Sequence, residues 1–399
     1  YTRACARAFG VGMDRGRAFF RPTMFAAFRS AKGAETESMS THTLTAAKEA
    51  KKDEFYTQLS DIENELRHYK EHFRGKTVLC NCDDPRVSNF FHYFAYQFEA
   101  LGLKRLITTC YKNQTPDLFS QHDCERAISL VYDGDKNGNR IPDPEEIGIH
   151  ELQGDGDFRS AECIELLMQS DIVVTNPPFS LFREYVAHLM QFDKKFLILG
   201  SQNNVTYKEV FRMFIENRIW LGYKAGDMAF RVPDDSEPRT TRYWQDENGQ
   251  KWRSLGNICW FTNLDIPKRH EELILFRKFN PALYPRYDNY DAIEVGKVED
   301  IPCDYAGTMG VPLTFLDKYN PDQFEIIGIT KTWFGITTKT YPEQIQISKD
   351  GTETKVTKLN DGAVLEVSSP PVGKTYYRVD GKYYIQTYPR ILIRRRKPA

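Results

Sequence analysis

Short apolar runs alternate with amphipathic helical segments between residues 76 and 217. Each apolar run ends at a polar residue or a turn, which is typical of strands buried on both faces of a parallel sheet. Ser60 and Glu63 have the spacing of a capping box at the first helix, and Gly75 and Gly102 close two of the helical segments. We therefore predict an α/β fold with a mostly parallel sheet. The expected strands are 76–82, 106–111, 127–132, 147–152, 171–175 and 196–200, and the expected helices are 60–73, 88–101, 160–169, 181–190 and 206–217.

The pattern changes after residue 220 into short strands separated by turns. Alternating Thr, Val and Tyr residues fill the later part, and Asp-Gly pairs within it are hairpin signals. These pairs are Asp350-Gly351, Asp361-Gly362 and Asp380-Gly381, and further strands are expected at 227–232, 251–262 and 323–330. We expect an α/β core over residues 51–226 and a smaller β-rich portion over 227–399 that completes the sheet and contains a hairpin-rich insert at 331–389.

The first 38 residues differ from the rest in charge, because basic residues outnumber acidic ones and give this segment a net charge of +4. One interpretation is an arginine-rich targeting segment. The other, which we favour, is upstream sequence translated in frame, with the true start at Met39. We therefore expect residues 1–50 to be a non-native or disordered leader outside the fold.

Composition limits the class of protein. Aromatic residues make up 13% of the chain, which argues against a disordered protein, and no apolar run approaches a membrane span. The net charge of −1 neither requires nor excludes a nucleic-acid partner.

The eight cysteines lack the spacing of a zinc ribbon, so we expect buried thiols in a reducing compartment. Residues 133–140 resemble the start of a calcium loop, but Pro144 stands where Glu is needed. We expect a polar turn there and no metal.

The most informative motif is Asn176-Pro177-Pro178-Phe179, which directly follows an expected strand. Two prolines cannot continue a strand ladder, because neither has an N–H group. They force an extended turn at the carboxyl end of a parallel strand, where open α/β sheets place their sites. The Asn176 amide oxygen and a proline carbonyl can hold both hydrogens of an exocyclic amine and aim its lone pair at an electrophile. Phe179 offers a face for a planar ring; the alternative is a plain turn with Phe179 in the core.

Acidic and aromatic residues precede this motif at the ends of other expected strands. Asp83 and Asp84 close the first strand, and Asp157-Phe158 follows a later one. A carboxylate there can accept from ribose hydroxyls or an amine, and an Asp-Phe pair suits an adenine amine and ring face. Each Asp is alternatively a helix N-cap. Phe55 and Thr57 lie just before the first helix, where an aromatic ring and a hydroxyl could close over a bound cofactor.

Together these residues resemble the amino-methyltransferases that use S-adenosyl-L-methionine, in the order found in N6-adenine enzymes of the gamma type. The chain is more specifically similar to the EcoRI-type family of adenine-specific DNA methyltransferases. The resemblance runs from about Lys51 to Thr330 and resumes at Tyr388. The segments that carry it are 51–66, 80–91, 154–167, 171–186 and 317–330.

The resemblance implies a Rossmann-like class I methyltransferase sheet with an added β-rich target-recognition portion. It also implies direct methyl transfer, without a metal, from S-adenosylmethionine to N6 of an adenine flipped out of double-stranded DNA. The implied catalytic residues are Asn176, Pro177, Pro178 and Phe179, and the implied cofactor-binding residues are Phe55, Thr57, Asp83, Asp84, Asp157 and Phe158.

Several features leave alternatives open. Residues 81–86 replace the Gly-rich turn that most such enzymes carry after the first strand, so a catalytically inactive DNA-binding relative is one alternative. Methyl transfer to RNA adenine or to a protein glutamine amide is another, because both present a planar NH₂ group. Trp260-Phe261 either sandwiches the flipped base or belongs to the core, and residues 394–397 either touch phosphates or form a solvated tail.

The biological setting is inferred from the same resemblance. We expect a cytoplasmic enzyme, prokaryotic or phage-encoded, that acts as a monomer and does not bind membranes. A cognate restriction endonuclease, where one exists, would act on the same DNA site without a stable complex.

Overall fold

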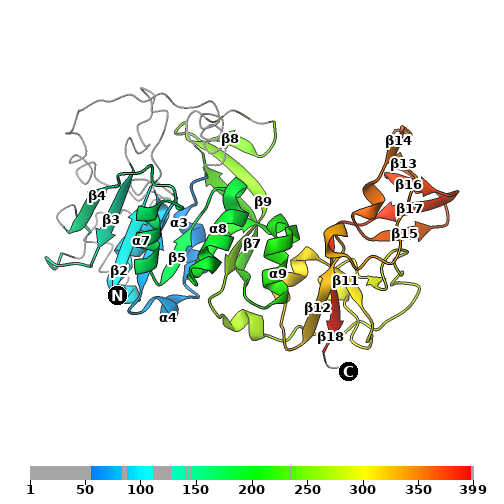
Figure 1. The fold of residues 1–399 in the computed structure, drawn as a ribbon, viewed down its shortest axis with the longest axis horizontal. Helices are drawn as coiled ribbons and strands as arrows, with labels where there is room; N and C mark the ends of the chain where they lie inside the picture. Colours follow the sequence, from blue (N-terminus) through cyan, green and yellow to red (C-terminus); the bar gives the residue numbers. More distant parts are fainter. Residues whose placement is uncertain are drawn as a thin grey trace.

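The computed structural model describes residues 55–82, 88–110, 127–139, 142–143, 146–232, 236, 238 and 240–396. The predicted leader and the candidate residues Asp83 and Asp84 lie outside these ranges. The largest unit is a nine-stranded sheet in the order β4-β3-β2-β1-β5-β6-β9-β7, with β8 paired to β9 (Figure 1). Its central strands are parallel, as predicted: β2 (Arg105–Thr109), β1 (Thr77–Cys80), β5 (Ile172–Thr175) and β6 (Lys195–Ser201).

The sheet as a whole is mixed, so the prediction of a mostly parallel sheet is wrong. β3 pairs antiparallel with β2 and β4, and β9 pairs antiparallel with β6, β7 and β8. The described residues between β3 and β4, and between β7 and β9, contain no helix, and strands joined without a crossover helix pair antiparallel. These strands are β3 (Ile128–Tyr132), β4 (Ile147–Glu151), β7 (Trp220–Arg231), β8 (Tyr243–Gln245) and β9 (Lys251–Thr262).

Helices cover both faces of the sheet, because successive residues of a strand point to opposite sides. Val78 of β1 packs into one core cluster and Leu79 into the other. The first cluster includes residues of α3 (Leu59–Leu66), α4 (Lys70–Phe73), α5 (Asn89–Tyr96) and α6 (Phe98–Leu101). The second includes residues of α7 (Ala161–Gln169), α8 (Phe182–Gln191) and α9 (Lys208–Ile215).

The first predicted helix differs from expectation at its start. Ser60 lies inside α3, and the N-cap residue is Gln58, which makes no side-chain cap. The capping-box prediction is therefore wrong. The Gln58 side chain instead donates to the main-chain carbonyl of Ala229 in β7 at 2.8 Å, so a long-range contact fixes the helix start. By contrast, Ser160 caps α7 by accepting from the Cys163 N–H group.

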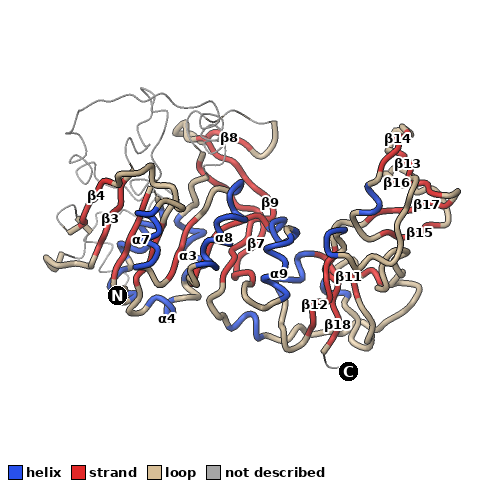
Figure 2. Tube along the Cα trace, viewed as in Figure 1, coloured by secondary structure: helices blue, strands red, loops and turns tan. Residues whose placement is uncertain are grey.

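Two smaller sheets follow, and Figure 2 draws the chain beyond α9 mainly as strands and loops. Asp350-Gly351 and Asp380-Gly381 turn the hairpins β13–β14 and β16–β17, as predicted. Asp361-Gly362 does not turn a hairpin, because β14 and β15 lie at opposite edges of their sheet. The four-stranded sheet has the order β10 (Ile293–Glu294), β11 (Met309–Pro312), β18 (Arg390–Arg395), β12 (Phe324–Ile329). The five-stranded sheet has the order β14 (Glu353–Val356), β13 (Gln344–Ile347), β16 (Tyr376–Val379), β17 (Lys382–Gln386), β15 (Val364–Val367).

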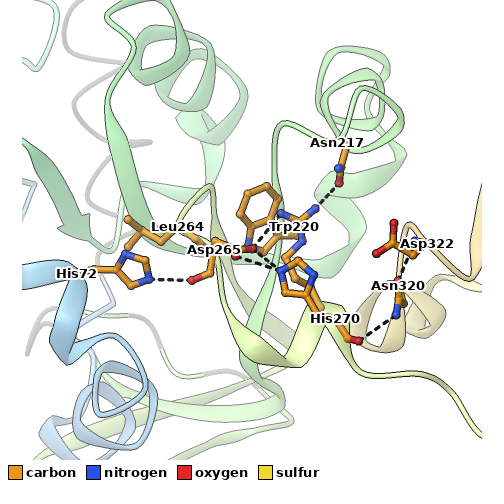
Figure 3. A network of polar contacts seen from close by, with 9 residues as sticks. His72, Asn217, Trp220, Leu264, Asp265, His270, Asn320 and Asp322 are labelled. Atoms are coloured by element: carbon orange, nitrogen blue, oxygen red, sulfur yellow. Dashed lines mark hydrogen bonds and ion pairs between the residues drawn. The ribbon is translucent and has the colours of Figure 1, made fainter.

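A polar network joins the large sheet to the chain that leads into the four-stranded sheet (Figure 3). The Asp265 carboxylate lies 2.8 Å from Nε2 of His270 and 3.4 Å from the guanidinium of Arg269. That guanidinium stacks on the ring of Trp220 in β7, 3.6 Å from its centroid. The main-chain carbonyl of His270 accepts from the Asn320 side chain at 3.1 Å. The network therefore links β7 to the segment just before β12.

A buried carboxylate holds an irregular stretch of β7. The register of β7 against β9 shifts between Leu221 and Ala225. Glu65 of α3, fully buried, accepts from the N–H groups of Tyr223 and Lys224 at 2.8 and 2.7 Å. Lys268 donates to the Tyr223 carbonyl at 3.2 Å. Burial raises the pKa of Glu65 above its ordinary value of 4.5, and the hydrogen bonds only partly oppose this.

The predictions about the cysteines and the turn after β3 can also be compared with the structure. Among the described cysteines, Cys163, Cys259 and Cys303 are free thiols. Cys110 is disulfide-bonded, so the expectation of thiols is wrong there, because chain size does not exclude an isolated bridge. The turn after β3 is polar, as predicted: Asp135 and Glu146 accept main-chain N–H groups. In the described ranges no helix is long and apolar enough to cross a membrane, and no group of His, Cys, Asp or Glu could hold a metal ion.

Candidate active site

The Asn-Pro-Pro-Phe turn directly follows β5 at the carboxyl end of the parallel strands. Asn176 and Pro177 are buried, Pro178 and Phe179 are half-buried, and a 3₁₀ turn over Phe179–Leu181 leads into α8. The hydroxyl of Thr175 donates to the carbonyl of Asn81, just beyond β1. The ends of β1 and β5 are therefore tied together directly beside the turn.

The side chain of Asn176 has one partner and one free acceptor. Its Nδ2 donates to the main-chain carbonyl of Phe55 at 2.6 Å. Its Oδ1 is buried and has no hydrogen-bond partner in the described part of the chain. Leaving a buried acceptor unsatisfied costs about 1–3 kcal/mol. The contact with Phe55 therefore fixes the amide so that a buried oxygen is available to a donor from outside.

Three aromatic rings meet at the Asn-Pro-Pro-Phe turn. Phe55 makes edge contacts with Phe179 and with Phe230 of β7, at centroid distances of 5.5 and 5.7 Å. The guanidinium of Arg253 in β9 lies 5.1 Å from the Phe55 centroid. Phe55 and Phe179 were predicted from the sequence, whereas Phe230 and Arg253 were not. Both missed residues lie on strands whose pairing with the segment before α3 left no signal in the sequence.

The segment before α3 is held against β7 by its backbone. Tyr56 and Arg231 form an antiparallel bridge, with N–H to carbonyl distances of 2.9 and 3.2 Å. The neighbouring Thr57 is buried, and its carbonyl accepts from the Asn89 side chain at 2.7 Å. The Thr57 hydroxyl is buried without a hydrogen-bond partner among the described residues. Phe55 is thus brought to the turn through its carbonyl and its ring, and Thr57 follows two residues later with a buried hydroxyl. Their role in holding a cofactor stays a prediction.

The backbone next to Asp157 packs closely against the end of β2. Gly156 has φ +80°, and a Cβ on it would lie 2.2 Å from the carbonyl oxygen of Cys110. The Asp157 carboxylate accepts from Arg159 through both oxygens, at 2.9 and 2.7 Å. Burial raises the pKa of Asp157, but the hydrogen bonds from Arg159 outweigh it, and the pKa lies below its usual value. Asp157 is therefore a fixed, ionised acceptor.

Phe158 packs against α8 rather than against the turn. Its ring makes edge contacts with Tyr185 and His188, at centroid distances of 5.0 and 5.3 Å. The Tyr185 hydroxyl donates to the Asn81 side-chain oxygen, and the Asn81 carbonyl accepts from Thr175. Asn81 thus links the Asp157-Phe158 pair to the Asn176 turn. Asn81 was not predicted as a site residue, although its position just after β1 is a signal in the sequence.

Two further pairs of residues were proposed from the sequence as cofactor or base contacts. Asp83 and Asp84 lie outside the described residues, so their cofactor role stays a prediction. Trp260 and Phe261 are fully buried: Trp260 contacts Phe90, and Phe261 packs with the rings of α8 and α9. Their interpretation as core residues is therefore confirmed.

Comparison with known proteins gives consistent results. The family described as Adenine-specific methyltransferase EcoRI matches residues 43–396. Type II methyltransferase M.EcoRI of Escherichia coli is 52% identical over 292 residues, which cover 72% of this chain and 89% of the relative. Type II methyltransferases M.MgeORF184P of Mycoplasma genitalium and M.MpnI of Mycoplasma pneumoniae are each 41% identical over 292 residues, covering 86% and 85% of their lengths. No solved structure matches the chain.

The extent of this match, together with the turn after β5, defines an adenine-specific methyltransferase. More particularly, the chain belongs to the EcoRI family of adenine-specific methyltransferases. The prediction of a site-specific adenine DNA methyltransferase of this family is therefore confirmed.

Proposed function

We propose that this protein transfers a methyl group from S-adenosylmethionine to N6 of an adenine that is flipped out of a specific site in double-stranded DNA. The observation that carries the proposal is the buried Asn176 Oδ1, which lacks a partner within the described ranges while its Nδ2 is anchored on Phe55. A fixed acceptor without a donor matches the N–H of an incoming amine. Extrusion of the base costs a few kcal/mol.

The chain's own residues position the amine. Asn176 Oδ1 accepts one N6 hydrogen and the Pro177 carbonyl accepts the other. The nitrogen lone pair then turns out of conjugation with the ring. Phe179 stacks on the base, a contact worth about 1–3 kcal/mol. The rate enhancement comes from positioning and from preorganised acceptors.

The site also suits the proposed cofactor, which supplies an electrophilic methyl group on a positively charged sulfur when bound. The orphaned Thr57 hydroxyl is a hydrogen-bonding group that an external ligand can satisfy. Arg159 occupies three of the roughly four lone-pair sites of the Asp157 carboxylate, which leaves capacity for one further donor such as an adenine amine. Phe55, Thr57, Asp157 and Phe158 would hold the cofactor, together with Asp83 or Asp84, which follow β1 in the sequence.

The topology supports assignment to the Rossmann-like class I methyltransferases. The four central strands are parallel, and β9 lies antiparallel between β6 and β7. Sites in open α/β sheets lie outside the carboxyl ends of the strands, which is where the Asn176 turn is found. We further propose that residues 227–399 contribute to DNA recognition. In this proposal the protein acts as a cytoplasmic monomer, and any cognate endonuclease acts separately on the same site.

The test uses the full chain with tritiated S-adenosylmethionine and unmethylated genomic DNA. We expect N6-methyladenine with the wild type and none with Asn176→Ala. Ser170→Ala is the control, because Ser170 is also a buried polar residue but lies just before β5, at the opposite end of that strand from the Asn176 turn. RNA and a glutamine peptide are assayed in parallel. Label on either of these and none on DNA would overturn the proposed substrate.

A further inference from the structure

Three residues on neighbouring strands form a row that faces the aromatic cluster. Arg253 of β9 is directly opposite Phe230 of β7 on one side and Tyr243 of β8 on the other. Directly opposite residues in a sheet have side chains on the same face. Phe230 and Arg253 both reach Phe55, at 5.7 and 5.1 Å. Tyr243 therefore points to the Phe55 face, and it packs against the same core cluster.

The hydroxyl of Tyr243 is an unexplained polar group. It is buried and has no hydrogen-bond partner in the part of the chain that the structure describes. The ring itself is half-buried, at the end of the sheet where β8 and the start of β9 extend outwards (Figure 1). A rotatable hydroxyl could easily point at water at such an edge. Because the hydroxyl is buried without a partner, we infer that an atom of a bound ligand forms a hydrogen bond with it.

The chemistry of the site identifies that atom. Asn176 Oδ1 and the Pro177 carbonyl are both acceptors, so they can hold only the amine of an adenine. The ring nitrogens of adenine are acceptors and need donors. On the sheet face that Tyr243 shares with Phe230 and Arg253, the Tyr243 hydroxyl is a neutral donor that is buried and unpaired in the described ranges. We propose that Tyr243 donates a hydrogen bond to a ring nitrogen of the target adenine and so positions the base.

This proposal rests on the proposed function and adds a residue to it. In this arrangement the acceptor pair fixes the amine, and the Tyr243 hydroxyl fixes the rotation of the ring within its plane. Both contacts come from elements far apart in sequence, the turn after β5 and the edge strand β8. Tyr243 is thus a positioning residue, because it touches the base but takes no part in the bond changes at N6.

The test compares wild type and Tyr243→Phe on DNA duplexes in which N1, N3 or N7 of the target adenine is replaced, one at a time, by C–H. We expect Tyr243→Phe to lower kcat/KM on unmodified DNA roughly 3- to 10-fold. One of the three replacements should lower wild-type kcat/KM by a similar factor and have no further effect in the variant. Such non-additivity is the sign of a direct contact.

Tyr132→Phe is the matched control, because Tyr132 is likewise a buried tyrosine of the large sheet but lies on β3, outside the residues proposed to bind the cofactor or DNA. It should leave kcat/KM unchanged for every substrate. A merely structural role of Tyr243 would lower kcat/KM equally on all duplexes, and that additive result would overturn the proposal. If the wild type methylates no adenine at all, the proposed function fails instead, so the two failures are distinguishable.

Discussion

The side-chain amide of Asn176 donates to the main-chain carbonyl of Phe55 at 2.6 Å and joins two motifs 121 residues apart. This contact determines which end of the amide faces the site. Because Phe55 takes the donor end, the acceptor end is left buried and unpaired within the described residues. The segment before α3 therefore orients the Asn176 side chain in addition to any contact that it makes with a cofactor.

Asn176→Asp tests this orientation. Aspartate keeps an oxygen acceptor but cannot donate to the Phe55 carbonyl, and a buried carboxylate beside a carbonyl is repelled. We expect the rate of methyl transfer in single turnovers to fall by about 10²-fold or more. S-adenosylmethionine affinity, measured by calorimetry, should change far less. A variant with near wild-type rate would show that the contact with Phe55 does not orient the side chain.

Gly156→Ala tests how Asp157 is placed. The added Cβ would lie 2.2 Å from the Cys110 carbonyl and 3.0 Å from the Ala127 side chain, so the loop must shift. We expect a lower thermal midpoint and at least about tenfold weaker cofactor binding. Gly138→Ala is the control, because Gly138 has the same φ of +80° but nothing within 4 Å. Equal losses in both variants would mean that backbone strain, and not the close approach, is responsible.

The central strands and the Asn176 turn could be predicted because their signals are local. Apolar runs mark buried strands, and two prolines end a ladder wherever they occur. The partners of the turn could not be predicted in this way. The bridge between Tyr56 and Arg231 and the contact of Phe230 with Phe55 depend on strand pairing across more than a hundred residues, for which one sequence gives no register. The same reason explains the antiparallel outer strands.

Asp265 gives a prediction for acid stability. Burial raises the pKa of its carboxyl, but the contacts with His270 and Arg269 outweigh burial, so the pKa lies below its ordinary value of 3.8. A lowered pKa means that the stabilisation is present above about pH 3.8 and is lost as the pH falls below it. Asp265→Asn should cost less than about 1 kcal/mol at pH 7, because the side chain is mostly exposed. Urea unfolding at pH 7 and pH 3.5 should show this difference shrinking at the lower pH.

The pKa of Glu65 is shifted in the opposite direction, so its effect on stability depends on pH in the opposite way. Burial raises its pKa above the ordinary value of 4.5, so its contribution to stability is fully present below that pH and declines as the pH rises through the raised pKa. Glu65→Gln leaves one of the two β7 N–H groups without an acceptor, which costs about 1–3 kcal/mol.

The penalty of Glu65→Gln should therefore be largest near pH 4.5 and smaller at pH 8, where the wild type must keep a buried charge. Urea unfolding at both pH values measures it. Glu63→Gln is the control, because Glu63 lies on the exposed side of the same helix, and its free energy of unfolding should differ little from that of the wild type. A Glu65→Gln penalty that does not change with pH would mean that the carboxyl keeps an ordinary pKa and that the N–H contacts of β7 alone account for its role.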